Sequence, residues 1–197
     1  MRLARWLGCD HRGVETTPGH TIRAARRGDA GRIAGIYAGF VETSASTFEE
    51  QAPTAAEMLR RMEGRPRLPW LVTVDSADTV VGFAYAGPHH ERSAYRWSLT
   101  CSVYLHESAQ GRGLAAALYR ELIDVVRDLG YVMLYAGIVL PNEASVAVHE
   151  RVGFRPVGVY PRPGFKLGAW RDVGWWWLAL RDPPEQPREP AEWDELG

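Results

Sequence analysis

The stretch SAQGRGLAAALYREL, residues 108–122, places Gly111 and Gly113 on either side of an arginine and then continues directly into a strongly helical segment. A glycine pair before a helix leaves several backbone N–H groups free to face one anion, and the helix dipole adds partial positive charge there. A phosphate ligand is the first interpretation, and a tight turn that needs glycine for a positive φ is the alternative. The two common nucleotide motifs are excluded, because Gly-Lys-Ser/Thr is absent and the spacing is not G-x-G-x-x-G in an opening βαβ unit.

The sequence around this loop predicts an α/β protein with eleven elements. A long aromatic and β-branched strand leads into the loop, and the helix after it carries an apolar stripe that ends at Gly130. Asp29, Thr54 and Asn142 are predicted helix caps, and Thr54 forms a capping box with Glu57. The order is strand-helix-helix-strand-strand-strand-helix-strand-helix-strand-strand, with strands over 21–26, 70–75, 79–87, 94–105, 131–140, 154–160 and 172–180.

Length and composition predict one domain. The chain has 197 residues, and its 23 basic and 24 acidic residues give a net charge of −1, without the basic footprint that nucleic-acid binding needs. Residues 1–19 and the proline-rich, acidic residues 182–197 are predicted tails, which leaves a domain over 20–181. The apolar run at 131–140 is half of what a membrane helix needs, so we expect no membrane partner and a cytoplasmic protein. Two cysteines form neither a disulfide framework nor a metal-ligand cluster, so no metal is expected.

The order of the elements resembles the GCN5-related N-acetyltransferase (GNAT) superfamily. The family's Gln/Arg-x-x-Gly-x-Gly/Ala loop is matched by the run Gln110-Gly111-Arg112-Gly113-Leu114-Ala115, and the Asn-capped helix is followed by Gly153-Phe154. The resemblance implies a mixed, mostly antiparallel sheet with a splayed central strand pair and flanking helices. It also implies acetyl-CoA as co-substrate, with its pyrophosphate held by the amides of the loop.

Longer segments of the sequence resemble the phosphinothricin N-acetyltransferase subfamily, which includes arsinothricin N-acetyltransferases. The resemblance extends over about 160 residues of the chain. They are VETSASTF (41–48), PWLV (69–72), AYAGP (84–88), AYRW (94–97), SVY (102–104), LPNEASVAVHERVGF (140–154) and GFKLGAWRDVGWW (164–176). Members acetylate the α-amino group of small amino acids that carry a phosphinate, sulfoximine, sulfone or arsinate side chain. The resemblance therefore implies an acetyl-CoA-dependent N-acetyltransferase for such a substrate.

Acetyl transfer from a thioester to an amine needs a stabilised oxyanion and a proton for the leaving thiolate. The resemblance implies that a backbone N–H at the end of the strand, in the run Val103-Tyr104-Leu105, stabilises the oxyanion. It adds contacts of Asn142 and Ser145, on the following helix, to the coenzyme. His149 lies where many relatives carry a tyrosine acid, so a catalytic or proton-relay role is predicted, with a structural histidine as the alternative.

The amine must also lose a proton before it attacks. The subfamily usually places a glutamate on the central strand in the pattern Trp-x-x-Glu-x-Ser-Val-Tyr, and this chain has Thr100 at that position. A threonine hydroxyl is not a base near neutral pH. Glu42 is the best remaining carboxylate, as base or amine anchor against a loop-ordering role, and a water chain that ends at His149 is the other route.

The anionic side chain of such a substrate needs cations and hydroxyls. Arg92 and His90 occupy positions where the family carries basic residues, and the alternative is a solvated loop. Phe48, Tyr95 and Tyr104 are predicted to wall the substrate pocket, although strand aromatics also build cores.

The three tryptophans at 175–177 place adjacent rings on opposite faces of a strand. At least one ring therefore points away from the core of its own subunit and is expected to be covered by another surface. That predicts a homodimer contact, or a rim against a neighbouring loop.

Other functions remain open at this level. Within the class, they are arsinothricin or methionine sulfoximine/sulfone N-acetylation. Outside it, Thr100 is compatible with a CoA-binding module that has lost catalysis, and acetylation of a protein N-terminus or lysine would need an open groove. Direct attack of the amine is expected, because Cys101 has no local histidine partner to activate it as an acyl carrier.

Overall fold

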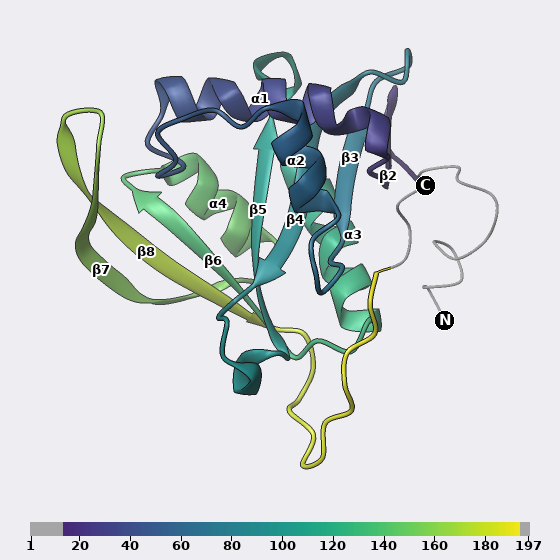
Figure 1. Ribbon diagram of the computed structural model, residues 1–197, viewed down its shortest axis with the longest axis vertical. Helices are drawn as coiled ribbons and strands as arrows, with labels where there is room; N and C mark the ends of the chain where they lie inside the picture. The colour runs from purple at the N-terminus through teal and green to yellow at the C-terminus, as the bar shows by residue number, and fades with distance from the viewer. Residues whose placement is uncertain (1–13, 194–197) are drawn as a thin grey trace.

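One twisted sheet of eight strands forms the centre of the protein, in the order β1-β2-β3-β4-β5-β6-β8-β7 (Figure 1). The structure is a computed structural model that describes residues 14–193. All neighbouring strands are antiparallel except β5 and β6, which are parallel. The strands are β1 (Val14–Thr17), β2 (His20–Ala24), β3 (Trp70–Val74), β4 (Val80–Pro88), β5 (Ser98–Leu105), β6 (Met133–Leu140), β7 (Arg155–Lys166) and β8 (Ala169–Ala179).

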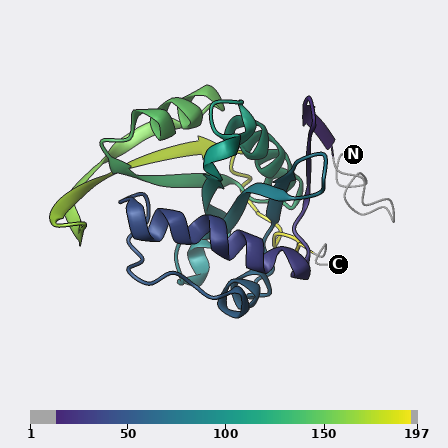
Figure 2. The ribbon, with the colours of Figure 1, turned by 90° about the horizontal axis from the view of Figure 1, so that it is seen from above.

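Four helices cover the two faces of the sheet, with α1 and α2 on one side and α3 and α4 on the other (Figure 2). Their bounds are Ala30–Thr43 for α1, Ala55–Met62 for α2, Leu114–Asp128 for α3 and Glu143–Arg151 for α4. Each side has its own core, because side chains alternate between the faces of a strand. On β5, Cys101 packs in the core under α3, whereas Tyr104 packs in the core under α1.

The parallel pair at the centre of the sheet opens after three residues. Residues 98–100 of β5 pair with residues 133–135 of β6, and beyond Thr100 this pairing stops. β5 continues to Leu105 against β4, while β6 continues to Leu140 against β8. The splayed strand pair and the mixed, mostly antiparallel sheet that the sequence predicted are therefore confirmed.

The helix caps agree only in part with the sequence prediction. Thr54 and Asn142 each accept a backbone N–H three residues ahead, as predicted. Asp29 precedes α1 but makes no side-chain cap bond to it. Its carboxylate instead receives the guanidinium of Arg23 at 2.7 and 3.0 Å and the N–H of Arg26 at 2.7 Å, because a buried arginine is a stronger partner than a helix amide.

Part of each segment that the sequence predicted as a tail packs on the domain. Val14–Thr17 pairs with β2, while residues 1–13 lie outside the described part of the chain. Residues 181–193, in yellow in Figure 1, run past the lower end of the sheet and return to the domain. Trp193 is 2% exposed in the core under α3, and its N–H donates to the carbonyl of Arg67. The folded unit therefore extends beyond the predicted bounds of 20 and 181 at both ends.

The strands β7 and β8 form a long hairpin that extends away from the body of the protein (Figure 1). Lys166, at its tip, is 6% exposed and donates to the carbonyls of Thr47 and Glu49 at 2.8 and 2.6 Å. This lysine therefore fixes the segment between α1 and α2 against the hairpin. No helix within residues 14–193 has the length and hydropathy needed to cross a membrane.

Candidate active site

The glycine loop adopts the backbone that its sequence predicts. Gly111 and Gly113 have φ values of 73° and 78°, in the left-handed region where a side chain would be strained. Gly113 is the N-cap of α3, and no side chain caps this helix. The turn therefore needs both glycines, and it also leaves the first amides of α3 without a side-chain partner, as an anion site requires. The two interpretations of the loop are compatible.

A cavity of about 430 Å³ lies where β5 and β6 diverge, between the glycine loop and α4. Most of the predicted coenzyme-binding residues line it, namely Val103, Tyr104, Leu105, Gln110, Gly111, Ala115, Asn142 and Ser145. Arg112, Gly113 and Leu114 are not among its lining residues, and Leu114 is fully buried in the core. Because β6 has left β5 there, alternate N–H groups of β5 face the cavity instead of a neighbouring strand.

His149 lies on the wall of this cavity, 4% exposed on α4. Its Nδ1 is 2.7 Å from the carbonyl oxygen of Ser145, which can only accept, so Nδ1 carries the proton. Its Nε2 is 2.8 Å from the hydroxyl of Tyr119 on α3, which therefore donates to it. Burial lowers the pKa of His149, an effect that the bond to Ser145 partly offsets. The imidazole is therefore neutral near pH 7.

Tyr119 extends this contact toward β5. It is 1% exposed and lines the cavity together with Cys101 and His149, and burial raises its pKa well above the ordinary value. Burial also raises the pKa of the Cys101 thiol strongly, and this thiol donates to the carbonyl of Tyr135 at 3.6 Å. A thiol that stays protonated is a poor nucleophile. The cavity thus presents a neutral tyrosine–histidine pair and an inert cysteine, as direct attack by an amine requires.

The opposite face of β5 carries Thr100 and Ser102, together with Tyr104. Thr100 donates its hydroxyl to the carbonyl of Gly87 at 3.4 Å, so it is a hydrogen-bond donor at the position where the subfamily has a carboxylate. Ser102 lines the cavity and lies opposite Tyr85 of β4 in the strand register. The hydroxyls on this face can orient an amine but cannot take its proton at neutral pH.

The other predicted residues lie apart from this cavity. Glu42 is exposed near the end of α1, and Phe48 is 39% exposed with its ring against Gly164 of the hairpin. His90 and Arg92 are exposed in the connection between β4 and β5, where the ring of His90 stacks on that of Tyr95 at 4.9 Å. None of these five side chains is among the residues that line the cavity.

Sequence reasoning missed several residues of the site. Tyr119 and Ser102 carried available signals, because Tyr119 lies one helical turn after Ala115 and Ser102 alternates with Cys101 on the strand. No sequence signal pointed to His89. Its ring stacks on the ring of Tyr135 of β6, with the centroids 4.3 Å apart, and Tyr135 is the residue that pairs with Thr100. Its contact depends on how two strands distant in sequence pair.

The cavity fits acetyl-CoA. The uncapped start of α3 can receive phosphate, and the open edge of β5 can receive the amide-rich pantetheine arm and the thioester. Among the described residues 14–193, no group of three histidine, cysteine or acidic side chains has the arrangement of a metal site.

Comparison with known proteins agrees with this geometry. Residues 22–175 match the model of the acetyltransferase (GNAT) domain. A phosphinothricin N-acetyltransferase of Streptomyces viridochromogenes is 35% identical over 86% of this chain and 93% of its own length. The L-amino acid N-acyltransferase MnaT of Escherichia coli is 34% identical over 84% of this chain and 96% of its own length.

Among solved structures, a phosphinothricin acetyltransferase of Sinorhizobium meliloti in complex with acetyl-CoA is 32% identical, with a TM-score of 0.82. The match covers 90% of this chain and 97% of that one. Since the family match extends over most of the chain and includes the glycine loop, the splayed strands and α4, this chain belongs to the GNAT family and is an acetyl-CoA-dependent N-acetyltransferase.

Proposed function

We propose that this enzyme acetylates the α-amino group of a small, anionic amino-acid-like compound of the phosphinothricin type, in resistance or detoxification. Two relatives named phosphinothricin N-acetyltransferase, 35% and 32% identical, support this substrate class. The observation that carries the proposal is the cavity at the divergence of β5 and β6, with His149 and Tyr119 on its wall. A relative in Salmonella typhimurium, 33% identical, is named L-methionine sulfoximine/L-methionine sulfone acetyltransferase, so these compounds are the alternative acceptors, together with arsinothricin.

The residues that would hold acetyl-CoA lie along the cavity. The amides of Gln110–Ala115 receive the pyrophosphate, and Asn142 and Ser145 contact the pantetheine arm. Bound acetyl-CoA supplies the acetyl group as a thioester. A free N–H of Val103, Tyr104 or Leu105 at the open edge of β5 stabilises negative charge on the thioester oxygen during attack.

His149 and Tyr119 form a proton relay in this proposal. Neutral His149 accepts the tyrosine proton at Nε2 while the Tyr119 oxygen takes a proton, through water, from the acceptor ammonium. When the C–S bond breaks, Tyr119 donates its proton to the departing sulfur and recovers one from Nε2, while the nitrogen that has formed the new C–N bond loses its second proton to water. Burial makes the charged imidazole unstable, so the proton is stored only briefly. This relay accounts for Thr100 standing where the subfamily has a glutamate.

The remaining predicted residues bind the acceptor in this proposal. Arg92 and His90 attract its anionic group, while Phe48, Tyr95 and Tyr104 wall its path, and Thr100 orients its amine. Glu42 anchors the ammonium as a carboxylate at the end of α1. These roles require the exposed loops to close over the acceptor.

A panel of acceptors tests the proposed function. Release of CoA from acetyl-CoA is measured with phosphinothricin, arsinothricin, methionine sulfoximine, methionine sulfone and glutamate. We expect turnover on at least one of the first four and at least about tenfold lower kcat/KM on glutamate, because a site built for one anionic group discriminates against another geometry. Binding of acetyl-CoA without turnover on any acceptor would contradict the proposal and favour a non-catalytic CoA-binding module.

We also propose a cytoplasmic homodimer that uses the β7–β8 hairpin. Of the predicted triple tryptophan, Trp176 is 7% exposed and its neighbours are half-buried, so this run supplies less surface than expected. The exposed apolar side chains lie further along the hairpin, at Val157, Val159, Tyr160, Phe165, Leu167 and Trp170. A patch of this kind on one arm favours a partner.

Light scattering tests the dimer. We expect a molar mass of twice the 22.0 kDa of one chain for the wild type, and that of one chain for Trp170→Glu, since a charge at the arm opposes apolar contact. Arg112→Glu, which introduces a glutamate on the exposed glycine loop instead, is expected to keep the dimer. A wild type with the mass of one chain would contradict the proposal.

A further inference from the structure

The chain has 23 basic residues, of which Lys166 is the one lysine and all the others are arginines. Lys166 lies at the tip of the β7–β8 hairpin, where its neighbours Phe165 and Leu167 are each 54% exposed, yet Lys166 itself is only 6% exposed. Lysine is seldom buried to this extent, because its ammonium loses water on burial and needs partners in return. The proposed function gives this buried ammonium no role.

The turn of the hairpin directs Lys166 inward. Lys166 pairs with Ala169 across the turn, and the two residues between them, Leu167 and Gly168, have positive φ values of 50° and 73°. A two-residue turn with two positive φ values matches the twist of the strands that it joins. Successive side chains of a strand point to opposite faces, so the exposed Phe165 and the buried Lys166 lie on different sides of the hairpin.

The ammonium of Lys166 donates to the carbonyl oxygens of Thr47 at 2.8 Å and Glu49 at 2.6 Å. Both acceptors are backbone atoms, so the contact fixes the path of the chain at residues 47–49. Hydrogen bonds from a charged donor are stronger than those between neutral groups. A guanidinium is a wide planar fork, whereas an ammonium is a compact donor that fits between two carbonyls. This site therefore fits lysine better than the arginine that the chain uses at its other basic positions.

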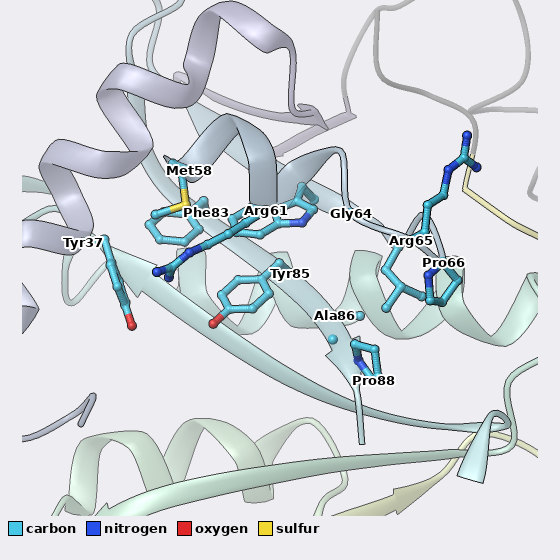
Figure 3. Close-up of a pocket in the computed structure, with 13 residues that line it drawn as sticks. Tyr37, Met58, Arg61, Gly64, Arg65, Pro66, Phe83, Tyr85, Ala86 and Pro88 are labelled. Carbon is cyan, nitrogen blue, oxygen red and sulfur yellow. The ribbon is translucent and has the colours of Figure 1, made fainter. Parts of the chain in front are cut away.

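A second set of contacts holds the side chains of the same residues. The carboxylate of Glu49 receives the guanidinium of Arg61 at 2.7 and 2.9 Å and the hydroxyl of Tyr37 at 2.9 Å. The Tyr37 oxygen is also 2.7 Å from the hydroxyl of Thr47. Figure 3 shows Arg61 extending from α2 toward Tyr37 of α1, and both line a cavity of about 270 Å³. Residues 47–49 are therefore fixed to α1 and α2 by side chains and to the hairpin by their backbone.

The fixed residues adjoin the acetyl-CoA cavity. Ser46, directly before them, lines this cavity. The ring of Tyr37 packs edge-to-face on that of Tyr104, another lining residue, with the centroids 4.9 Å apart. A shift of residues 47–49 would therefore move the wall of the cavity on the side of α1. The glycine loop leads into α3, which covers the other face of the sheet together with α4 (Figure 2).

We infer that Lys166 is a positioning residue for the acceptor: through residues 47–49 it holds the wall of the acetyl-CoA cavity on the side of α1 in the place that a bound amine requires. The inference rests on the proposed acetylation of an amine at the open edge of β5, whichever acceptor carries that amine. Lys166 is not among the residues that line the cavity, so it affects binding of the acceptor and not the chemical step. When the acceptor is enclosed, residues 47–49 and the hairpin tip move as one unit.

Lys166→Met tests the inference, because methionine has a similar length but no donor for the two carbonyls. We expect the KM of the acceptor to rise by about tenfold or more, with kcat and the Kd of acetyl-CoA within about threefold, since only acceptor binding is weakened. Lys166→Arg is expected to raise this KM as well, because the guanidinium does not fit the place of the ammonium. Arg155→Met, an exposed basic residue on the same strand, is the matched control and is expected to change none of these values.

Gly164→Ala disturbs the same contact from the hairpin and leaves Lys166 in place. A Cβ at Gly164 would lie 2.8 Å from the ring of Phe48, which is 39% exposed and can move at little cost in stability. The displaced ring shifts residues 47–49, so the KM of the acceptor is expected to rise by about threefold to tenfold at constant kcat. This variant keeps the inference testable even where Lys166→Met does not fold.

Amide hydrogen exchange gives a readout that needs no acceptor. We expect residues 44–49 to exchange about tenfold faster in Lys166→Met than in the wild type, with α4 unchanged. Unchanged exchange at residues 44–49 overturns the inference. An acceptor KM within about threefold of the wild type in both Lys166→Met and Gly164→Ala, or a lower kcat at constant KM, also overturns it. Faster exchange together with a wild type that acetylates none of the phosphinothricin-type acceptors supports the inference and contradicts the proposed function.

Discussion

Replacing His149 by glutamine is expected to lower kcat by about a hundredfold to ten-thousandfold, the usual range for loss of a general acid–base group. Glutamine keeps a polar side chain at a site that is 4% exposed, but it cannot store the proton that Tyr119 passes to Nε2. Acetyl-CoA affinity, measured by calorimetry, is expected to stay within about threefold, because the imidazole is engaged by Ser145 and Tyr119. The measurement is kcat by CoA release on the best acceptor of the panel.

Tyr119→Phe is the companion variant, and the double variant distinguishes the relay from two separate roles. If one proton passes through both residues, the double variant is expected to be no slower than the slower single variant. Effects that multiply, or a His149→Gln enzyme that keeps its kcat and only unfolds more easily, would show that the histidine is structural. Neither variant changes Ser102 or Thr100, so the face of β5 that would bind the acceptor stays the same.

The pH profile gives an independent readout of the same residue. A protonated imidazole cannot accept the tyrosine proton, so activity is expected to fall as pH decreases through the pKa of His149. Because burial lowers this pKa, the acidic limb of kcat is expected below the ordinary value of 6.5 and to be absent in His149→Gln.

The second large effect is expected on stability, in Trp193→Ala. This side chain is 2% exposed within the core under α3, so truncation leaves a cavity and is expected to reduce the free energy of unfolding by about 3–5 kcal/mol. The backbone of the same segment is held by the N–H of Ala191, which donates to the carbonyl of Leu129 at 2.7 Å. Urea unfolding followed by circular dichroism measures the change.

Gln186→Ala is the control within the same segment. Its side chain is exposed, so the free energy of unfolding is expected to change by less than about 0.5 kcal/mol. A loss below about 1 kcal/mol in Trp193→Ala would mean that residues 182–193 are the loose tail that their composition predicts.

Much of the fold follows from the sequence alone. Gly111 and Gly113 determine a turn with positive φ before α3, Thr54 and Asn142 determine where two helices begin, and the order of elements identifies the splayed sheet. These signals are local: caps, turns and periodicity act between residues no more than about one helical turn apart. The family resemblance that they carry was enough to identify acetyl-CoA and the chemistry.

The partners within the site needed the tertiary structure. Cys101, Tyr119 and His149 come from β5, α3 and α4, and only the packing of these three elements brings a tyrosine hydroxyl to the imidazole. The residues around Trp193 are proline-rich and acidic, a composition typical of a tail. The Trp193 side chain nevertheless packs in a core built from residues far earlier in the chain. The cavity of about 270 Å³ that Met58, Arg61 and Tyr85 line likewise exists because α2 and the loop after it pack over β4. Local propensity determines where elements begin and end, whereas burial and hydrogen bonds between distant elements determine which side chains meet.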